Sequence, residues 1–250
     1  MAQAASSDVN NFELKNFAST VELAEYTASL WLEQVRKKPT QTVAFSGGTI
    51  ARLLFQKIAE RALAEKIILS DVHFFWADER CVPPTDPESN FALANENFFS
   101  RLNIQPDKIH RLCGELDQLE SVARANHEIA RVISPGVSGL PALDIIFLGL
   151  GPDGHVASLF PNARLEVITC EQPFLSIENS PKPPPKRISL SYAAIAAAKE
   201  VWVLISGDGK ETALRESLSE TGATSLARVI QSRPQTKIFT DVKFNDAARL

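Results

Sequence analysis

The chain has 250 residues, of which 44% are hydrophobic and 22% are charged, and its formal net charge is −4. This length is enough for one large α/β domain or for two smaller ones. Nucleic acid or an anionic membrane is disfavoured as the main partner, because each needs a basic face and the chain has no block of basic residues. A local basic pocket for a small anion remains compatible with this charge.

The cysteines and the apolar stretches indicate a soluble protein of a reducing compartment. Cys81, Cys113 and Cys170 lie far apart, and an odd number without paired spacing predicts neither a disulfide framework nor a zinc motif. The N-terminus lacks a basic region followed by an apolar run, so we expect no secretory signal. The apolar stretches have about the length of a strand, far below the roughly 20 residues of a membrane helix. We therefore expect a cytoplasmic protein that does not bind membranes.

Helical and strand patterns alternate along the chain. Apolar residues at spacings of three and four predict a helix from a cap at Ser19/Thr20 to Val35, another over 50–58, and a less regular one over 122–130. Nearly continuous apolar runs predict strands that are covered on both faces. These runs are 42–45, 72–76, 144–148 and 201–205. The alternation predicts a three-layer α/β sandwich with a mainly parallel, Rossmann-like sheet.

A proline-rich segment, SPKPPPKR at 180–187, is the one low-complexity stretch. Three consecutive prolines cannot continue a helix or a central strand, so we expect a stiff extended loop. The segment is compatible with a domain linker, but the strand-like residues at 188–190 favour a loop within one domain. We therefore predict a single domain over residues 1–250.

Each of the four predicted strands ends in a polar or glycine-rich turn. The turns read SGGT, ADER, GLGPDGH and SGDGK. In an open α/β sheet, ligands bind beyond the carboxyl ends of the strands. The convergence of four such turns at one edge predicts an active site there.

The first turn consists of Ser46, Gly47, Gly48 and Thr49 and precedes a predicted helix. Glycines let the backbone approach a ligand closely, and a helix N-terminus offers free N–H groups to a phosphate. The alternative is a tight turn in which Thr49 caps the helix.

Charged residues at the other turns supply candidates for anion binding. Asp78, Glu79 and Arg80 form either a solvated surface cluster or part of the site, where Arg80 would clamp an anion or stabilise an oxyanion. Asp78 would orient an imidazole or bind sugar hydroxyls. Arg187 and Lys210 are isolated basic residues that would add the positive charge an anionic substrate requires.

His155 closes the glycine-rich loop GLGPDGH. Histidine has an unperturbed pKa of about 6.5, which suits a general base near neutral pH. The alternative is a structural histidine that caps a helix over 156–160. His73, His110 and His127 have no comparable setting, and without ligand spacing we expect no catalytic metal.

Six segments in this order resemble the 6-phosphogluconolactonases, in a superfamily that includes the glucosamine-6-phosphate deaminases. They are FSGGT (45–49), WADERCVP (76–83), SNF (89–91), LGLGPDGHVASLFP (148–161), PPPKRISLS (183–191) and VWVLISGDGK (201–210). The resemblance implies the deaminase-like α/β fold without a cofactor. It also implies hydrolysis of 6-phospho-D-glucono-1,5-lactone to 6-phospho-D-gluconate, the second step of the oxidative pentose phosphate pathway.

The resemblance also implies roles for individual residues. His155 looks like the general base, with Asp78 and Arg80 as its catalytic neighbours. The remaining candidates for substrate binding are Ser46, Gly47, Gly48, Thr49, Glu79, Asn90, Asp153, Arg187 and Lys210. The family often has a proline shortly after the glycine pair, where this chain reads Thr49-Ile50-Ala51; this departure affects the rigidity of the helix start rather than the N–H donors.

The sequence disfavours three alternatives to a lactonase. The sister deaminases typically have a tyrosine where this chain has Arg80 and a catalytic glutamate where it has Phe160. A serine hydrolase is disfavoured because no G-x-S-x-G motif is present. A non-catalytic phosphosugar-binding module is disfavoured by the intact His155 loop. The sequence leaves open whether Asp78 or Asp153 orients His155, the δ- or γ-lactone preference, any coupling to a dehydrogenase, and the oligomeric state, for which a monomer is one option.

Overall fold

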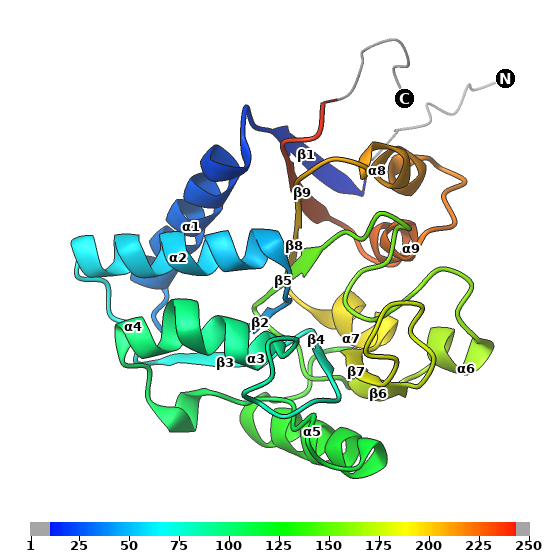
Figure 1. Cartoon of the computed structure of the whole chain (residues 1–250), viewed down its shortest axis with the longest axis horizontal. Coiled ribbons are helices and arrows are strands. Elements are labelled where there is room, and N and C mark those ends of the chain that lie inside the picture. Colours follow the sequence, from blue (N-terminus) through cyan, green and yellow to red (C-terminus); the bar gives the residue numbers. More distant parts are fainter. Residues whose placement is uncertain (1–10, 244–250) are drawn as a thin grey trace, which may run out of the picture.

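A six-stranded parallel sheet forms the centre of the computed structural model, which describes residues 11–243 (Figure 1). The strand order is β1-β9-β8-β5-β2-β3, and every neighbouring pair is parallel. In that order the strands are β1 (Phe12–Asn16), β9 (Thr236–Thr240), β8 (Glu200–Ile205), β5 (Ile145–Gly149), β2 (Gln41–Phe45) and β3 (Val72–Trp76). The predicted mainly parallel sheet is confirmed. The first ten and last seven residues, which carry the expectation about a secretory signal and the ends of the predicted 1–250 domain, lie outside the described residues.

Helices cover both faces of this sheet. In Figure 1, α1 (Thr20–Lys37) and α2 (Thr49–Ala64) lie on one side of it, and α7 (Tyr192–Ala197), α8 (Glu211–Leu218) and α9 (Ser225–Gln231) lie on the other. The predicted cap of α1 is confirmed, because the Ser19 side chain accepts a hydrogen bond from the Glu22 N–H at 3.2 Å. This arrangement of helices on both faces of a parallel sheet is the predicted α/β sandwich.

A second sheet of three antiparallel strands packs beside the first. Its order is β4 (Asp78–Arg80), β7 (Arg187–Leu190) and β6 (Phe174–Ile177), so that Arg80 lies opposite Arg187 in the register. Helix α5 (Gln118–Val132) packs against β6 and β7. The remaining elements are α3 (Asn90–Ala94), the π-helix η1 (Asn95–Phe99), α4 (Ser100–Leu102), the 3₁₀-helix η2 (Pro106–Lys108) and α6 (Leu165–Ile168).

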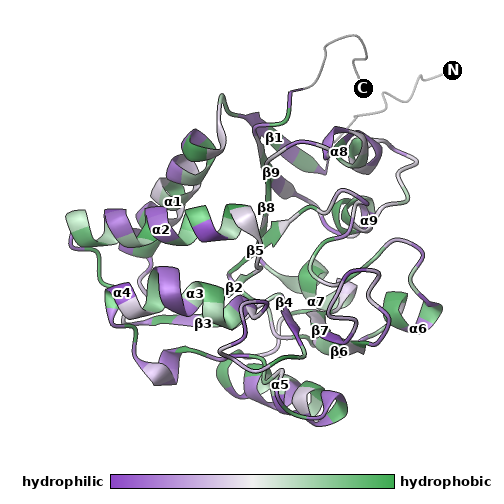
Figure 2. Cartoon of the chain, viewed as in Figure 1, coloured by the Kyte–Doolittle hydropathy of each residue, from purple (hydrophilic) through white to green (hydrophobic). Residues whose placement is uncertain are grey.

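The core lies between the parallel sheet and its covering helices. Trp31 of α1, Phe45 of β2 and Trp202 of β8 are each at most 1% exposed. The helices show alternating hydrophobic and hydrophilic bands in Figure 2, as expected for helices that bury one face. Within residues 11–243, no helix combines the length and the apolar character needed to cross a membrane.

Two alternatives left open by the sequence are excluded, and the expectation of an extended proline-rich loop was wrong. Residues 156–160 form a turn, not a helix, with Ala157 at φ 49° and the Leu159 N–H bonded to the Val156 carbonyl. Thr49 is not the cap of α2, since Gly48 occupies that position without any side-chain cap. The proline-rich segment is curled rather than extended, because the Ser180 N–H reaches back to the Pro185 carbonyl at 2.9 Å.

Candidate functional site

A cavity of about 450 Å³ lies at the carboxyl ends of β2, β5 and β8. Its volume falls in the range of small-molecule sites. Ten of the twelve predicted site residues line it, namely Ser46, Gly47, Gly48, Thr49, Asp78, Arg80, Asn90, His155, Arg187 and Lys210. Glu79 and Asp153 do not. The predicted convergence of the four turns on one cavity is therefore confirmed.

The SGGT turn presents free backbone donors at the start of α2. The first hydrogen bond into this helix runs from Arg52 N to Gly48 O at 3.1 Å, so the N–H groups before Arg52 have no helical acceptor. Gly48 has φ 99°, a conformation that favours glycine. A Cβ at Gly47 would lie 1.8 Å from Asn90 Oδ1. The two glycines thus serve different needs, one a backbone conformation and the other close packing.

Asp78 is held at the cavity wall by two side chains. Its Oδ2 accepts from the Ser158 hydroxyl at 2.7 Å, and its Oδ1 accepts from Asn90 Nδ2 at 3.3 Å. Asn90 Nδ2 also donates to the Asp78 carbonyl at 2.9 Å. Asp78 is 4% exposed and Ser158 is fully buried. The carboxylate is therefore fixed in direction and keeps capacity to accept a hydrogen bond from a ligand hydroxyl.

Glu79 does not face the cavity, so the expectation that it contacts substrate is wrong. Its carboxylate is 2% exposed and accepts from the N–H groups of Arg80, Asn90 and Phe91 and from the Ser89 hydroxyl, at 2.7–3.0 Å. Burial raises the pKa of Glu79, although these four hydrogen bonds oppose the shift. Glu79 fixes the start of α3 and, through it, the position of Asn90.

Arg80 reaches the cavity from β4 and is anchored at one end. Its Nη1 donates to the Glu88 carbonyl at 2.6 Å and lies 3.4 Å from the Glu88 carboxylate. Its Nε is buried and has no hydrogen-bond partner among residues 11–243. The Arg80 side chain is 22% exposed and lines the cavity, so its guanidinium can meet an anionic or carbonyl oxygen there.

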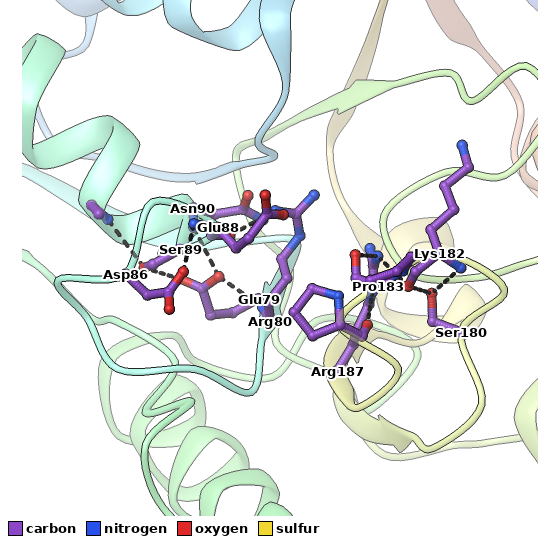
Figure 3. Close-up of polar contacts among 12 residues, drawn as sticks. Glu79, Arg80, Asp86, Glu88, Ser89, Asn90, Ser180, Lys182, Pro183 and Arg187 are labelled. Carbon is purple, nitrogen blue, oxygen red and sulfur yellow. Dashed lines mark hydrogen bonds and ion pairs between the residues drawn. The ribbon is translucent and has the colours of Figure 1, made fainter.

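Carbonyl groups of the curled proline-rich loop bind the guanidinium of Arg187. Nε donates to the Pro184 carbonyl at 3.1 Å, and Nη2 donates to the carbonyls of Lys182 and Pro183 at 3.0 and 3.2 Å. Figure 3 shows these contacts as one group and those around Glu79 as another. Arg187 is 3% exposed, and burial lowers its pKa. The loop thereby points a fixed guanidinium at the cavity.

Sequence reasoning missed Lys182 and Thr20, which also line the cavity. Lys182 belongs to the loop that holds Arg187, and its Nζ lies 3.9 Å from Asp153 Oδ1. The sequence feature that could have indicated Lys182 is its position as a basic residue within the proline-rich loop. Thr20 had no sequence signal, because it reaches the site from the start of α1. Its hydroxyl lies 2.6 Å from the Ser206 hydroxyl and donates to Asp241 at 2.5 Å.

Lys210 stands at the cap position of α8 and lines the cavity. Burial lowers its pKa, and the charge of Asp241 opposes this shift. The four cations of the lining are Arg80, Lys182, Arg187 and Lys210, against the single carboxylate of Asp78. A chain with a net charge of −4 therefore has a positively charged cavity, which suits an anionic ligand.

His155 is oriented by Asp153. Its Nδ1 lies 2.5 Å from Asp153 Oδ1, whereas its Nε2 has no partner among the described residues. A Cβ at Gly151 would lie 2.0 Å from Nδ1, so the ring packs directly on this glycine. Burial lowers the pKa of His155, and the hydrogen bond to Asp153 opposes the shift. A neutral ring with a free Nε2 lone pair results, which is the form a general base needs.

The described residues offer no cluster suited to a metal: across 11–243, no group of three or more histidine, cysteine, aspartate or glutamate side chains is placed to hold one. The three cysteines are free thiols. The titratable groups that line the cavity are His155, the carboxylate of Asp78 and the four cations.

Comparison with known proteins agrees with this geometry. Residues 16–239 match the family model described as glucosamine-6-phosphate isomerases/6-phosphogluconolactonase. The chain belongs to this family. It is 33% identical over 232 residues to 6-phosphogluconolactonase 3, chloroplastic, of Arabidopsis thaliana, covering 88% of this chain and 69% of that protein. It is 34% identical over 212 residues to the 6-phosphogluconolactonase of Aggregatibacter actinomycetemcomitans, covering 83% of this chain and 86% of that one.

A solved structure of this family has the same fold. The crystal structure of 6-phosphogluconolactonase from Thermotoga maritima superposes with a TM-score of 0.77 at 27% identity, over 92% of this chain and 98% of that chain. The plant relatives are longer than this chain, which spans 69% of the Arabidopsis protein and 63% of a rice relative. The predicted family and fold are confirmed.

Proposed function

We propose that the chain hydrolyses 6-phospho-D-glucono-1,5-lactone to 6-phospho-D-gluconate, the second step of the oxidative pentose phosphate pathway. The observation that carries the proposal is a neutral His155 with a free Nε2 in a cavity lined by four cations and one carboxylate. A general base supplies water activation, and the cations suit a phosphorylated substrate. The names of the family members that the chain resembles support the same reaction.

The phosphate group docks at the start of α2. The N–H groups that precede Arg52, together with Arg187 and Lys210, donate to its oxygens. Lys182 adds a fourth source of positive charge. Because this anchor is remote from the reacting carbonyl, its binding energy places the lactone for attack.

The reaction proceeds by addition of water to the lactone carbonyl. Nε2 of His155 takes the proton from water as the C–O bond forms, while Asp153 stabilises the resulting imidazolium through Nδ1. Arg80, whose Nε is unpaired, stabilises the oxyanion of the tetrahedral intermediate. When the bond from this carbon to the ring oxygen breaks, the imidazolium gives its proton to that oxygen. Asp78 accepts a hydrogen bond from a sugar hydroxyl.

Phe160 favours this reaction over that of the sister deaminases. The centroid of the Phe160 ring lies 4.7 Å from the centroid of the His155 ring. The Arg187 guanidinium carbon lies 5.8 Å from the same Phe160 centroid. A deaminase needs a second acid–base group at the position that Phe160 fills. Hydrolysis of a lactone needs only one base, and an apolar ring beside that base contributes to the burial that lowers its pKa.

The test is a pH-stat assay with freshly prepared 6-phosphogluconolactone, run in parallel with glucosamine 6-phosphate. We expect the wild type to turn over the lactone but not glucosamine 6-phosphate. His155→Ala should lose the lactone turnover and keep a nearly unchanged affinity for the phosphosugar. Full activity of the variant would overturn the role of His155, and turnover of glucosamine 6-phosphate would favour the deaminase. Binding of 6-phosphogluconate by calorimetry without lactone turnover would favour a non-catalytic module.

A reducing compartment such as the cytoplasm is the proposed location. The three free thiols support it, one of them being the 4% exposed Cys113. The names of the plant relatives place those proteins in the chloroplast. Cell fractionation followed by immunodetection tests the location, and recovery of the protein outside the cytoplasmic fraction would contradict it.

A further inference from the structure

A second cavity of about 580 Å³ is lined by residues of β3, of the segment from α3 to α4 and of α5. Figure 1 shows where these elements lie in the fold. None of the residues found to line the second cavity lines the catalytic cavity. Its volume is within the range of small-molecule sites and exceeds that of the catalytic cavity. The proposed reaction does not use it.

Four of the residues that line this second cavity are phenylalanines. Phe75, Phe99 and Phe174 line it and are each at most 2% exposed, and the half-buried Phe91 contributes from α3. The accessible ring is therefore that of Phe91, and an exposed aromatic face favours a flat ring in offset or edge-to-face contact. Ala125 of α5 takes up little of the cavity volume, because its side chain is a single methyl group.

The polar groups of the second cavity are mostly paired already. Arg111 holds the Glu115 carboxylate with both Nη atoms, at 2.8 and 2.5 Å. Glu128 accepts from Arg131 and lies 2.7 Å from a ring nitrogen of His110. Among the charged side chains the exception is Arg124, an exposed residue whose guanidinium has neither an ion pair nor a hydrogen bond among the described residues, although its charge helps to lower the pKa of Glu115.

These features select one class of ligand. The accessible ring of Phe91 accepts a flat ring, and the unpaired Arg124 adds attraction for an anionic group at the same site. A molecule of a few rings that carries one carboxylate, sulfonate or phosphate satisfies both requirements.

The start of α3 connects the two cavities. Asn90 lines the catalytic cavity and the next residue, Phe91, lines the second one. The N–H groups of both donate to the buried Glu79 carboxylate, at 2.8 and 2.9 Å. Asn90 in turn packs on Gly47 of the proposed phosphate site. A ligand that displaces Phe91 therefore acts on Asn90 through a short, hydrogen-bonded segment.

We propose that the second cavity binds a small aromatic anion, and that its occupancy changes ligand affinity at the catalytic cavity through the Glu79-held start of α3. This inference goes beyond the proposed reaction. Its first part stands whether or not the chain is a lactonase.

Binding is tested with 8-anilinonaphthalene-1-sulfonate, a fluorescent aromatic anion, on the full-length chain. We expect saturable binding, an affinity about 3- to 10-fold weaker in Arg124→Gln, as for the loss of one partly exposed ionic contact, and loss of binding in Ala125→Phe. Arg101→Gln, a nearby exposed arginine outside both cavities, is the matched control and should bind as the wild type does.

Two results would overturn the binding site. One is the absence of saturable binding by the wild type, and the other is wild-type affinity in Arg124→Gln. Circular dichroism shows whether Ala125→Phe is folded. If it is not, Arg124→Gln, a surface substitution, still decides the question.

Coupling is tested by calorimetry of 6-phosphogluconate with and without saturating 8-anilinonaphthalene-1-sulfonate. We expect the affinity for 6-phosphogluconate to change about fivefold or more, the usual lower range of coupling between two sites. Glu79→Gln should still bind the dye and should lose this change. Equal 6-phosphogluconate affinities with and without the dye in the wild type would overturn the coupling, and so would full coupling in Glu79→Gln. Both the dye-binding and the 6-phosphogluconate-binding measurements are equilibrium measurements, so they can be interpreted even if the pH-stat assay shows no lactone turnover.

Discussion

His155 and the His73–His110 pair differ in whether a ring nitrogen remains without a hydrogen-bond partner. At the catalytic cavity, His155 gives Nδ1 to Asp153 and keeps Nε2 without a partner. At the β3 edge, His110 pairs Nδ1 with Glu128 at 2.7 Å and Nε2 with His73 Nδ1 at 2.8 Å. The remaining nitrogen, His73 Nε2, faces Lys108 at 3.4 Å.

The His73–His110 pair belongs to a closed chain of hydrogen bonds. Glu128 accepts from His110, so the neutral His110 must accept from His73, and His73 must accept from Lys108. Each ring then has one proton and no free lone pair. Burial lowers the pKa of both rings, as it does for His155. A lowered pKa is therefore common to all of these rings, and the free nitrogen beside a cavity is what separates a candidate base from a structural histidine.

The largest test of this comparison removes each ring in turn. His155→Ala should lower kcat by about 10²–10⁴-fold, the usual contribution of a general base, with little change in KM. His110→Gln should leave kcat within about twofold of the wild type, because no nitrogen of His110 is free to act. Steady-state lactonase kinetics measures both. Equal losses in the two variants would contradict the distinction.

The next test removes the orienting carboxylate. Asp153→Asn should lower kcat by roughly 10- to 100-fold, the rate equivalent of losing a hydrogen bond to a charged group worth about 1.5–3 kcal/mol. The amide can also donate to Nδ1 and so stabilise the wrong tautomer. Single-turnover kinetics measures the chemical step directly. An unchanged rate would shift the orienting role to Asp78, the other carboxylate considered from the sequence.

A smaller effect is expected on the pH profile. Activity requires neutral His155, so it is lost as the pH falls through the pKa of His155. Lys182 lowers this pKa, and Asp153 raises it. In kcat/KM against pH, Lys182→Gln should therefore move the acid limb to higher pH, and Asp153→Asn should move it to lower pH. Titration of the substrate phosphate is common to all profiles and cancels between variants. Shifts of the same sign would contradict the assignment.

The smallest effect concerns stability. Unfolded histidine has a pKa of about 6.5, and burial lowers the pKa of His73 and His110 in the folded state. The unfolded chain therefore binds more protons below about pH 6.5, and the free energy of unfolding should fall as the pH drops below that value. His110→Gln should reduce this slope in urea unfolding between pH 7 and 5.5. An unchanged slope would mean that the closed chain does not set the acid sensitivity.

Much of the catalytic cavity could be predicted from the sequence, because its residues follow apolar strands. Ser46, His155 and Lys210 each come soon after a strand of the parallel sheet, and the carboxyl ends of such strands share an edge. Asn90 was named through the resemblance to the family, and Arg187 through the proline-rich loop that precedes it, rather than by this rule. Strands β1 and β9 were not predicted, since their apolar patterns are less clear than those of the other strands. β1 is an edge strand that pairs only with β9, whereas β9 lies between β1 and β8.

What the sequence could not supply was the direction of side chains. Glu79 and Asp78 are adjacent in β4 and so point to opposite faces, one to a buried cluster and the other to the cavity. The conformation of the proline-rich loop depends on the Arg187 guanidinium, which donates hydrogen bonds to three carbonyl groups of the loop. The choice of Asp153 over Asp78 as the partner of His155 likewise required the positions of both carboxylates.

The most direct test of the central claim is the pKa of His155 itself, measured by following its Cε1–H resonance in a pH titration of the ligand-free protein by NMR, with His155→Gln used for assignment. The structure predicts a value below the usual 6.5 and an Nε2 that titrates in the absence of substrate. A value at or above 6.5 would contradict the account of His155 as a buried, neutral base poised to activate water.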